Sequence, residues 1–457
     1  MNGPAQSGPA QRGRARTSVV QIIPVQAGPV VRTGTAAIAS VATGAVSVSD
    51  VVAECLGQVA ELDPSIGAFR VVDEAGARDR AKQFDHRVAG PLHGLVAGIK
   101  DVIDTADLPT GYGSPLFAGH QPAADADVVA ALRRAGAIVL GKTESTEFAM
   151  FHPARTRNPV DPGRTPGGSS SGSAAAVAAG MVPVALGTQT AGSVVRPAAF
   201  CGVYGFKPSR GWTSARGVWR LSEQLDTVGI FARCAADLAA VYRVLATAAP
   251  AGGTWPGPAA PHPPSVAVLR AEEWGAPDRD VHDALSSVAG RLADRGWRVK
   301  EMAMPAAWRR LPGHHEVVMA AETARNLHAS LGERIGQISG AAQAVVERGD
   351  RCTAREYLAA LDARDEALRV LAPLSAAADL VLTPSALGVA PEGLEYTGDP
   401  VMCRAWTLLG LPAANVPAVR RPDGLPVGVQ FVGVGRDDLS YLTHLALVEG
   451  ALTHKED

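Results

Sequence analysis

The amino-acid sequence predicts an α/β fold, formed as a single large domain around a central mixed, mostly parallel sheet that helices cover on both faces. Three observations lead to this prediction. Strand-like and helix-like segments alternate through the first half of the chain, the pattern of parallel strands joined by helical crossovers. Several apolar runs lack polar alternation, which is typical of strands buried on both faces. Hydrophobic residues make up 47% of the 457 residues and charged residues 19%, so a large core is available.

The first half of the chain supplies the clearest elements. Ser47 or Ser49 can cap a helix whose apolar residues recur at helical spacing until Pro64, where we expect it to end. The run LHGLVAGIKDVID predicts a strand buried on both faces. The other elements expected here are a strand at 68–72, helices at 76–88 and 126–135, and a strand at 137–141.

The second half continues the same domain. A Pro/Gly-rich segment at 250–264 interrupts the pattern, but strand-like residues resume at 265–269 and 297–302, so we expect a connection within one domain. A helix-rich segment at 314–372 is predicted as an insertion before the strand ADLVLTP. A strand at 427–433 and a final helix complete the prediction.

Residues 1–33 differ in composition from the rest. They are rich in Gly, Pro, Ala, Gln and Arg and contain no acidic residue, a composition that does not form a core. Prolines and polar residues also interrupt the apolar stretch that a secretory signal needs. We therefore expect a disordered N-terminal tail at 1–33 and a folded domain at 34–457.

Charge and cysteine content limit the possible functions. The net charge of −2 gives no electrostatic basis for binding nucleic acid or a membrane surface, and no run of 18 apolar residues predicts a transmembrane helix. Five widely spaced cysteines without a C-x-x-C pair are typical of free thiols in a reducing compartment. We expect a cytoplasmic protein that acts on a small molecule, with no nucleic acid and no membrane as partner.

The segment 164–208 combines a Gly/Ser loop at 167–173, a helix of small residues, an apolar strand and a second Gly/Ser turn at 190–193. Its glycines permit positive φ and its serines can cap a helix, so both turns could be purely structural. Alternatively, backbone N–H groups could form a site for an oxyanion, with serine hydroxyls as nucleophile and proton carrier. The segment alone leaves both interpretations open.

Two familiar motifs match by letter but not by context. Residues 136–143 fit the phosphate-binding pattern G-x-x-x-x-G-K-[ST], yet the residues between the glycines are strand-like. Residues 168–172 fit G-x-S-x-G with Ser170 as nucleophile, yet the three preceding prolines argue against the strand that this motif requires. The pair His314-His315 lacks the spacing of a zinc motif, so we expect no metal ion.

Lys100 lies inside a predicted buried strand, where a lysine is unusual. Burial disfavours the charged ammonium and lowers its pKa. The adjacent Asp101 would point to the opposite face of a strand, so it is not the obvious partner. The chain has six lysines against 37 arginines, which makes a lysine at this place informative. Lys100 could extend its ammonium to the surface, or it could act as a general base.

The sequence resembles the amidase signature family, serine hydrolases that cleave carboxamides with a Ser, cis-Ser, Lys triad. The likeness extends from about residue 45 to residue 451. It rests on GIKDVID at 98–104, TPGGSSSGSAAAVAAG at 165–180, ALGTQTAGS at 185–193 and RPAAFCGVYGFKPSRG at 196–211. The motifs LDTVG and LTPSA and the stretch 410–433 add support.

This resemblance implies roles for particular residues. Ser193 would be the nucleophile, Ser169 the serine that follows a cis peptide bond after Gly168, and Lys100 the base. Ser170 would support the triad by hydrogen bonding. The implied oxyanion hole consists of the backbone N–H groups of Thr190, Ala191, Gly192 and Ser193.

Two positions depart from the family's usual pattern. The family usually places Asp four residues before the nucleophile and Arg two after it, where this chain has Gln189 and Val195. Malonamidase-like members, which this chain resembles in detail, carry TQT before the nucleophile and Arg three residues after it, here Arg196. We expect Gln189 and Arg196 to bind substrate, with Arg196 holding a substrate carboxylate; a structural ion pair of Arg196 is the alternative.

The predicted function is hydrolysis of a small carboxamide through an acyl-enzyme on Ser193, with Ser169 and neutral Lys100 as proton relay and with no cofactor. We expect a homodimer. Two alternatives remain open at this point. The chain could be the glutaminase-like subunit of a tRNA-dependent amidotransferase, which passes ammonia to a partner protein, or a non-catalytic binding protein on the same fold.

Overall fold

The computed structural model describes residues 32–88, 90–246, 263–435 and 437–453. Most of the predicted tail, and most of the Pro/Gly-rich segment at 250–264, lie outside these residues. The described chain begins in contact with the domain, because Nη2 of Arg233 donates to the Arg32 carbonyl at 2.9 Å. Thr33 then caps the first helix, α1 (Gly34–Ala42), with its hydroxyl.

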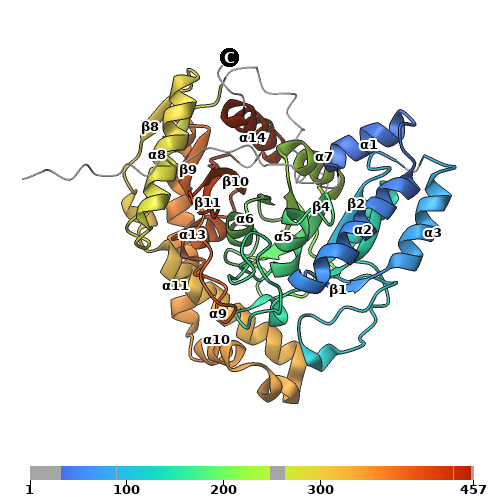
Figure 1. Cartoon of the computed structure of the whole chain (residues 1–457). Coiled ribbons are helices and arrows are strands. Elements are labelled where there is room, and N and C mark those ends of the chain that lie inside the picture. The colour runs from blue at the N-terminus through green and yellow to red at the C-terminus, as the bar shows by residue number, and fades with distance from the viewer. Residues whose placement is uncertain (1–31, 89, 247–262, 436, 454–457) are drawn as a thin grey trace, which may run out of the picture.

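Among the described residues, eleven strands form one sheet that runs across the molecule from β1 to β8 (Figure 1). Their order in the sheet is β1-β3-β2-β4-β6-β5-β10-β11-β9-β7-β8. The strands are β1 (Phe69–Val72), β2 (Val96–Lys100), β3 (Ile138–Thr143), β4 (Val184–Gln189), β5 (Tyr204–Lys207), β6 (Thr227–Ala232), β7 (Val266–Val268), β8 (Val299–Glu301), β9 (Leu380–Pro384), β10 (Ala413–Arg420) and β11 (Pro426–Gly433).

The α/β class, the single domain and the mixed sheet are confirmed, but the expectation of a mostly parallel sheet is wrong. Six of the ten strand pairs in the described sheet are antiparallel. The four parallel pairs join β2 to β3 and β4, and β7 to β8 and β9. The physical reason is that β5 and β6 follow each other without a helical crossover, and that β10 and β11 form a hairpin around the turn Arg-Pro-Asp-Gly.

Helices cover both faces of the sheet. Neighbouring residues of β2 belong to different cores: Val96 packs with residues of α2, α5 and the region of α6, whereas Ala97 packs with residues of α4, α7, α8 and α14. The strand therefore has no exposed face, as its unbroken apolar run predicts. These helices are α2 (Val48–Ile66), α3 (Glu74–Phe84), α4 (Asp127–Arg134), α5 (Ser171–Ala178), α6 (Val195–Cys201), α7 (Ala235–Leu245), α8 (Arg279–Asp294) and α14 (Asp438–Thr453).

Helix α2 begins as predicted but ends later. Ser47 and Asp50 form a reciprocal capping box at its N-terminus. Pro64 lies inside the helix rather than ending it, because it stands in the last turn, where loss of one N–H donor costs little continuity. Gly67 ends the helix instead, at φ +66°, and its N–H bonds to the Asp63 carbonyl at 2.7 Å.

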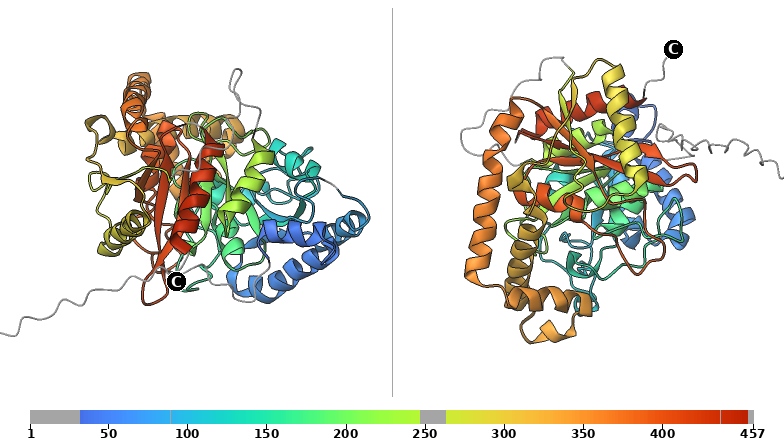
Figure 2. Two further views of the ribbon diagram at one scale, coloured as in Figure 1. Left: turned by 90° about the horizontal axis from the view of Figure 1, so that it is seen from above. Right: turned by 90° about the vertical axis from the view of Figure 1, so that its left-hand side faces the viewer.

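The predicted insertion forms a helical layer at one end of the sheet (Figures 1 and 2). Helix α9 packs against α10, α11 and α13, so the insertion becomes part of the domain rather than a separate unit. Its core includes two fully buried tryptophans, Trp308 and Trp406, whose rings meet edge to face. These helices are α9 (Leu311–Leu331), α10 (Gly340–Asp350), α11 (Ala354–Arg369), α12 (Leu371–Ser375) and α13 (Val401–Leu409).

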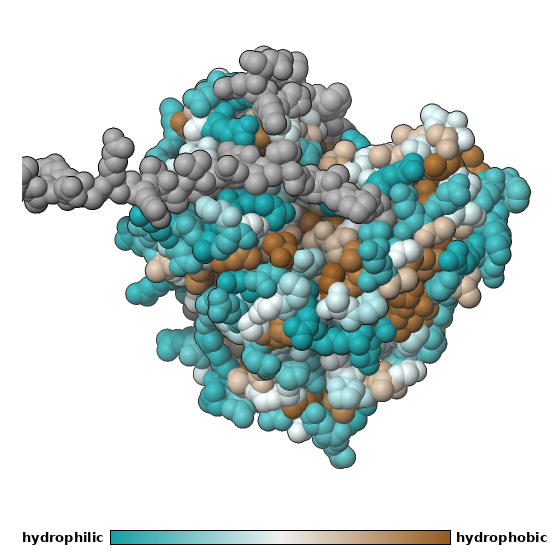
Figure 3. Space-filling model, viewed as in Figure 1, coloured by the Kyte–Doolittle hydropathy of each residue, from teal (hydrophilic) through white to brown (hydrophobic). Residues whose placement is uncertain are grey.

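The surface has no dominant apolar feature among the residues described. The face seen in Figure 3 alternates hydrophobic and hydrophilic side chains. The large apolar side chains that are exposed, Val88, Leu358, Tyr396 and Leu447, come from four separate segments and define no contact area for a second copy. The homodimer therefore stays a prediction. None of the described helices could cross a membrane, and all five cysteines are free thiols.

Close packing of α5 against the sheet generates the first testable prediction. A Cβ at Gly172 would stand 2.1 Å from the Ala68 carbonyl oxygen and 2.4 Å from the Glu144 nitrogen. We expect Gly172→Ala to destabilise the protein by about 1–3 kcal/mol, because the helix must shift from the strands. Urea unfolding measures the change. The matched control is Gly290→Ala in α8, where no atom lies within 4 Å of the new Cβ. That variant gains helix propensity of about 0.5–1 kcal/mol, so equal effects of the two changes would contradict the packing argument.

Candidate active site

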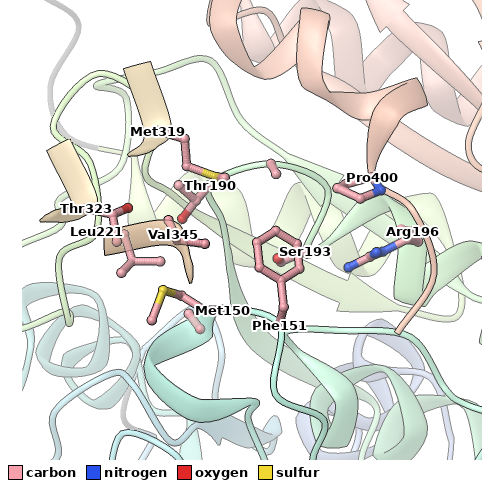
Figure 4. Close-up of a pocket in the computed structure, with 12 residues that line it drawn as sticks. Met150, Phe151, Thr190, Ser193, Arg196, Leu221, Met319, Thr323, Val345 and Pro400 are labelled. Carbon is pink, nitrogen blue, oxygen red and sulfur yellow. The ribbon is translucent and has the colours of Figure 1, made fainter. Parts of the chain in front are cut away.

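The turn between β4 and α6 carries Ser193 into a pocket (Figure 4). The pocket encloses about 370 Å³, including its part open to solvent. Ser193 lies between two different ends of it. Apolar side chains that include Met150, Leu221 and Met319 gather on one side, and the Arg196 guanidinium lies on the other. Arg196 is the only charged residue among those described residues that line the pocket.

Lys100 ends β2 with no exposed surface. Its Nζ donates to Ser169 Oγ at 2.7 Å and to Thr188 Oγ1 at 2.8 Å. Burial holds the pKa of Lys100 well below its usual range, and the partly compensating charge of Asp226 raises it. A buried lysine with hydroxyl partners and a depressed pKa is available as a neutral amine, which can accept a proton.

The serines predicted for the triad converge only in part. Ser169 follows a cis peptide bond after Gly168, which confirms that prediction, and its hydroxyl reaches Lys100. Ser193 Oγ makes no hydrogen bond to any described residue, so the second link of the predicted relay is open in this structure. Hydrogen bonds of catalytic groups are often long in proteins without substrate and tighten in the complex.

Ser170 supports the site through the backbone of β4. Its Oγ donates to the Thr188 carbonyl at 3.2 Å and lies 3.3 Å from the Thr188 nitrogen. It therefore reaches Lys100 only indirectly, because the Thr188 side chain is the second hydrogen-bond partner of that lysine. The fully buried Ser170 also does not point into the pocket, as a nucleophile of the G-x-S-x-G type would.

The turn 190–193 is held by its carbonyl oxygens. Each oxygen has a donor within hydrogen-bonding distance: His315 Nε2 for Thr190 at 2.8 Å, Thr407 Oγ1 for Ala191 at 2.8 Å, and the Arg196 N–H for Gly192 at 2.9 Å. The N–H groups of Ala191, Gly192 and Ser193 donate to no described residue. Free N–H donors with bound carbonyls are what an oxyanion site requires.

Gln189 holds the start of α6 rather than facing the pocket. Its Oε1 accepts the N–H groups of Val194 and Val195 at 2.9 and 3.1 Å, and its Nε2 donates to Thr407 at 2.9 Å. The side chain is buried and both ends of its amide are bound. The predicted contact of Gln189 with substrate is thus untested, and its contacts in the structure position the turn that carries Ser193.

Arg196 is buried without a carboxylate. It donates to the carbonyls of Gly168, at 2.6 Å, and Gly398, while its Nε has no hydrogen-bond partner. It forms no ion pair with a described residue, contrary to the structural alternative considered for it. Burial lowers the pKa of Arg196 to about 10. An anion in the pocket would compensate this buried charge.

Four residues of the site escaped sequence analysis. Thr188, Asp226, His315 and Thr407 all contact the residues discussed above. The Asp226 carboxylate accepts the Thr190 hydroxyl at 2.6 Å, and burial raises its pKa to about 6. Asp226 lies in the motif LDTVG, which could have drawn attention to it. The others come from distant segments, and no local pattern identifies them.

Comparison with known proteins agrees with this geometry. The family model described as Amidase matches residues 50–442. A curated relative, a glutamyl-tRNA(Gln) amidotransferase subunit from Roseiflexus castenholzii, is 34% identical over 451 residues, covering 88% of this chain and 92% of the relative. No cluster of His, Cys, Asp or Glu suitable for a metal ion occurs in the described ranges.

Solved structures of relatives share the fold. A 6-aminohexanoate cyclic dimer hydrolase complexed with substrate superposes with a TM-score of 0.81 at 27% identity, covering 92% of this chain and 97% of that chain. The corresponding glutamyl-tRNA(Gln) amidotransferase subunit from Thermotoga maritima superposes with a TM-score of 0.72 at 27% identity, covering 86% and 89%. The names of these relatives do not support the finer resemblance to malonamidase-like members. The chain belongs to the amidase family.

Proposed function

We propose that this protein cleaves the C–N bond of a carboxamide through an acyl-enzyme on Ser193. The observation that carries the proposal is the fully buried Lys100, bound to Ser169, beside a turn with unbonded N–H groups next to Ser193. A binding protein has no need for a desolvated amine at this position, since burying a lysine costs stability. The non-catalytic alternative is weaker for that reason.

The reaction follows from these positions. Ser193 Oγ attacks the amide carbon while its proton passes to Ser169, whose own proton moves to the neutral amine of Lys100. The N–H groups of Ala191, Gly192 and Ser193 receive the developing oxyanion. The relay then runs backward to protonate the leaving amine, and a water molecule, deprotonated by the same relay, releases the acid.

The relatives point to two substrate classes. The names of the curated relatives favour glutamine, used by a subunit that delivers ammonia to a partner. The hydrolase among the solved relatives favours an independent amidase with a small-molecule substrate. Both classes can include a carboxylate, which would neutralise Arg196. We propose a carboxylate-bearing carboxamide as the substrate, with glutamine as one member of the class.

The triad generates a direct prediction. Ser193→Ala should lower kcat by roughly four orders of magnitude or more, and Ser169→Ala and Lys100→Met should each come close to this loss, because such groups act as a unit. Ammonia or amine release from a panel of carboxamides that includes glutamine measures it. A fluorophosphonate probe should label Ser193 in the wild type. A folded protein that the probe does not label, or a triad variant with near-normal turnover, would refute the mechanism.

The same panel separates the two substrate classes. Glutamine as the preferred substrate, together with a copurifying partner protein and transfer of ammonia to charged tRNA, identifies a component of an amidotransferase. Turnover of other acid-amides by the chain alone identifies an independent amidase. Size-exclusion chromatography of the same preparation tests the expected homodimer.

Lys100 generates a prediction about pH. Because the base is the neutral amine, kcat/KM should fall with decreasing pH as Lys100 becomes protonated, and the midpoint should lie well below the usual pKa of lysine. Asp226, with its pKa near 6, is the alternative origin of such a limb. Asp226→Asn separates the two. Since the Asp226 charge raises the pKa of Lys100, this variant should move the limb to lower pH, whereas loss of the limb would assign it to Asp226.

Arg196 generates a prediction about selectivity. If it holds a substrate carboxylate, Arg196→Gln should raise KM for a dicarboxylic acid monoamide far more than for the methyl ester of the same monoamide. The difference should correspond to about 2–4 kcal/mol, the cost of leaving the substrate's charge buried and unpaired. Equal losses on both compounds would mean that Arg196 serves only to hold the carbonyls of Gly168 and Gly398.

A further inference from the structure

Helix α9 brings a histidine from the insertion into contact with the turn 190–193. His315 has no exposed surface, and its Nε2 lies 2.8 Å from the Thr190 carbonyl oxygen, 125 residues away in the sequence. Its Nδ1 is buried and has no hydrogen-bond partner. Within the described part of the chain, this ring therefore makes one hydrogen bond, and that bond is directed at the turn.

The contact determines the tautomer of the ring. A carbonyl oxygen can only accept, so Nε2 must carry the proton and donate it. A second proton on Nδ1 would create a buried cation near Arg404, whose guanidinium pairs with Glu316 on the same helix as His315. Burial, followed by the Arg404 charge, lowers the pKa of His315 to about 3. The ring is a neutral donor throughout the working range of pH.

The hydrogen bond acts on the next N–H through the geometry of the peptide unit. The oxygen of Thr190 and the N–H of Ala191 belong to the same planar trans unit and point in opposite directions. Holding the oxygen on His315 therefore aims the Ala191 N–H away from α9. Thr407 does the same for the Gly192 N–H, and the backbone of α6 does it for the Ser193 N–H.

We propose that His315 is a positioning residue that aims the Ala191 N–H at the developing oxyanion, and that α9 thereby joins substrate recognition to oxyanion stabilisation. This inference rests on the proposed function, because it assumes an oxyanion beside Ser193. His315, Met319 and Thr323 follow each other at intervals of four and so share one face of the helix. The last two line the pocket, so substrate contacts the same helix face that holds Thr190.

The test compares two substitutions of His315. His315→Leu removes the donor and keeps an apolar side chain of similar reach, and it should lower kcat by about 10- to 100-fold with KM changed less than about threefold. His315→Gln places an amide N–H near the position of Nε2 and should restore kcat to within about threefold of the wild type. The rate of Ser193 labelling by a fluorophosphonate should follow the same order. His314→Leu, on a neighbouring position of α9 outside the pocket lining, is the matched control and should retain the wild-type kcat.

A measurement on the unmodified protein covers the case in which His315→Leu does not fold. In a spectrum of ¹⁵N-histidine-labelled protein, the signals absent from His315→Gln belong to His315. They should show a protonated Nε2, an unprotonated Nδ1 and no titration between pH 5 and 9. Titration near the ordinary pKa of histidine, or a kcat of His315→Leu equal to that of the wild type, would overturn the inference. An inactive wild type that the probe does not label would instead overturn the proposed function.

Discussion

The desolvation of Lys100 is the constraint on which the rest of the site depends. An ammonium at the end of a fully buried strand would be costly, so the protein supplies two hydroxyl partners and lowers the pKa until the neutral amine is accessible. The parallel register of β2 and β4 provides one of them. Ile99 pairs with Leu186, so the end of β2 lies beside Thr188 on the neighbouring strand. The sheet thereby places a base without using a carboxylate at that point.

The oxyanion turn depends on a different principle, the control of N–H directions through carbonyl contacts. The three oxygens that precede these N–H groups bind to α9, α13 and the backbone of α6. Gln189 ties the same turn to the start of α6 with both ends of its amide. Preorganised donors stabilise developing charge without reorganisation at the moment of reaction, and here the preorganisation comes from tertiary contacts.

The pocket explains why one family can contain both independent hydrolases and subunits that work with partners. Its reactive centre is formed by β2, the loop before α5 and the turn after β4. Its walls come from other segments, among them Met319 of α9, Val345 of α10 and Pro400 before α13. Substitutions in those helices can change the substrate while Lys100, Ser169 and Ser193 keep their places. Arg196 is an intermediate case, since it touches both the Gly168 carbonyl and the pocket.

The sequence by itself determined the α/β class, the buried strand that carries Lys100, the insertion before β9 and the identity of the Gly/Ser segment. These features are local, because apolar periodicity, capping residues and an ordered run of motifs lie within short windows. The tertiary structure decided the rest. Strand direction in the centre of the sheet, the contacts of Gln189 and Arg196, and the approach of His315 and Thr407 to the turn 190–193 depend on residues more than a hundred positions apart. A periodic pattern reports which face of an element is buried, but it contains no information about which distant donor meets which carbonyl.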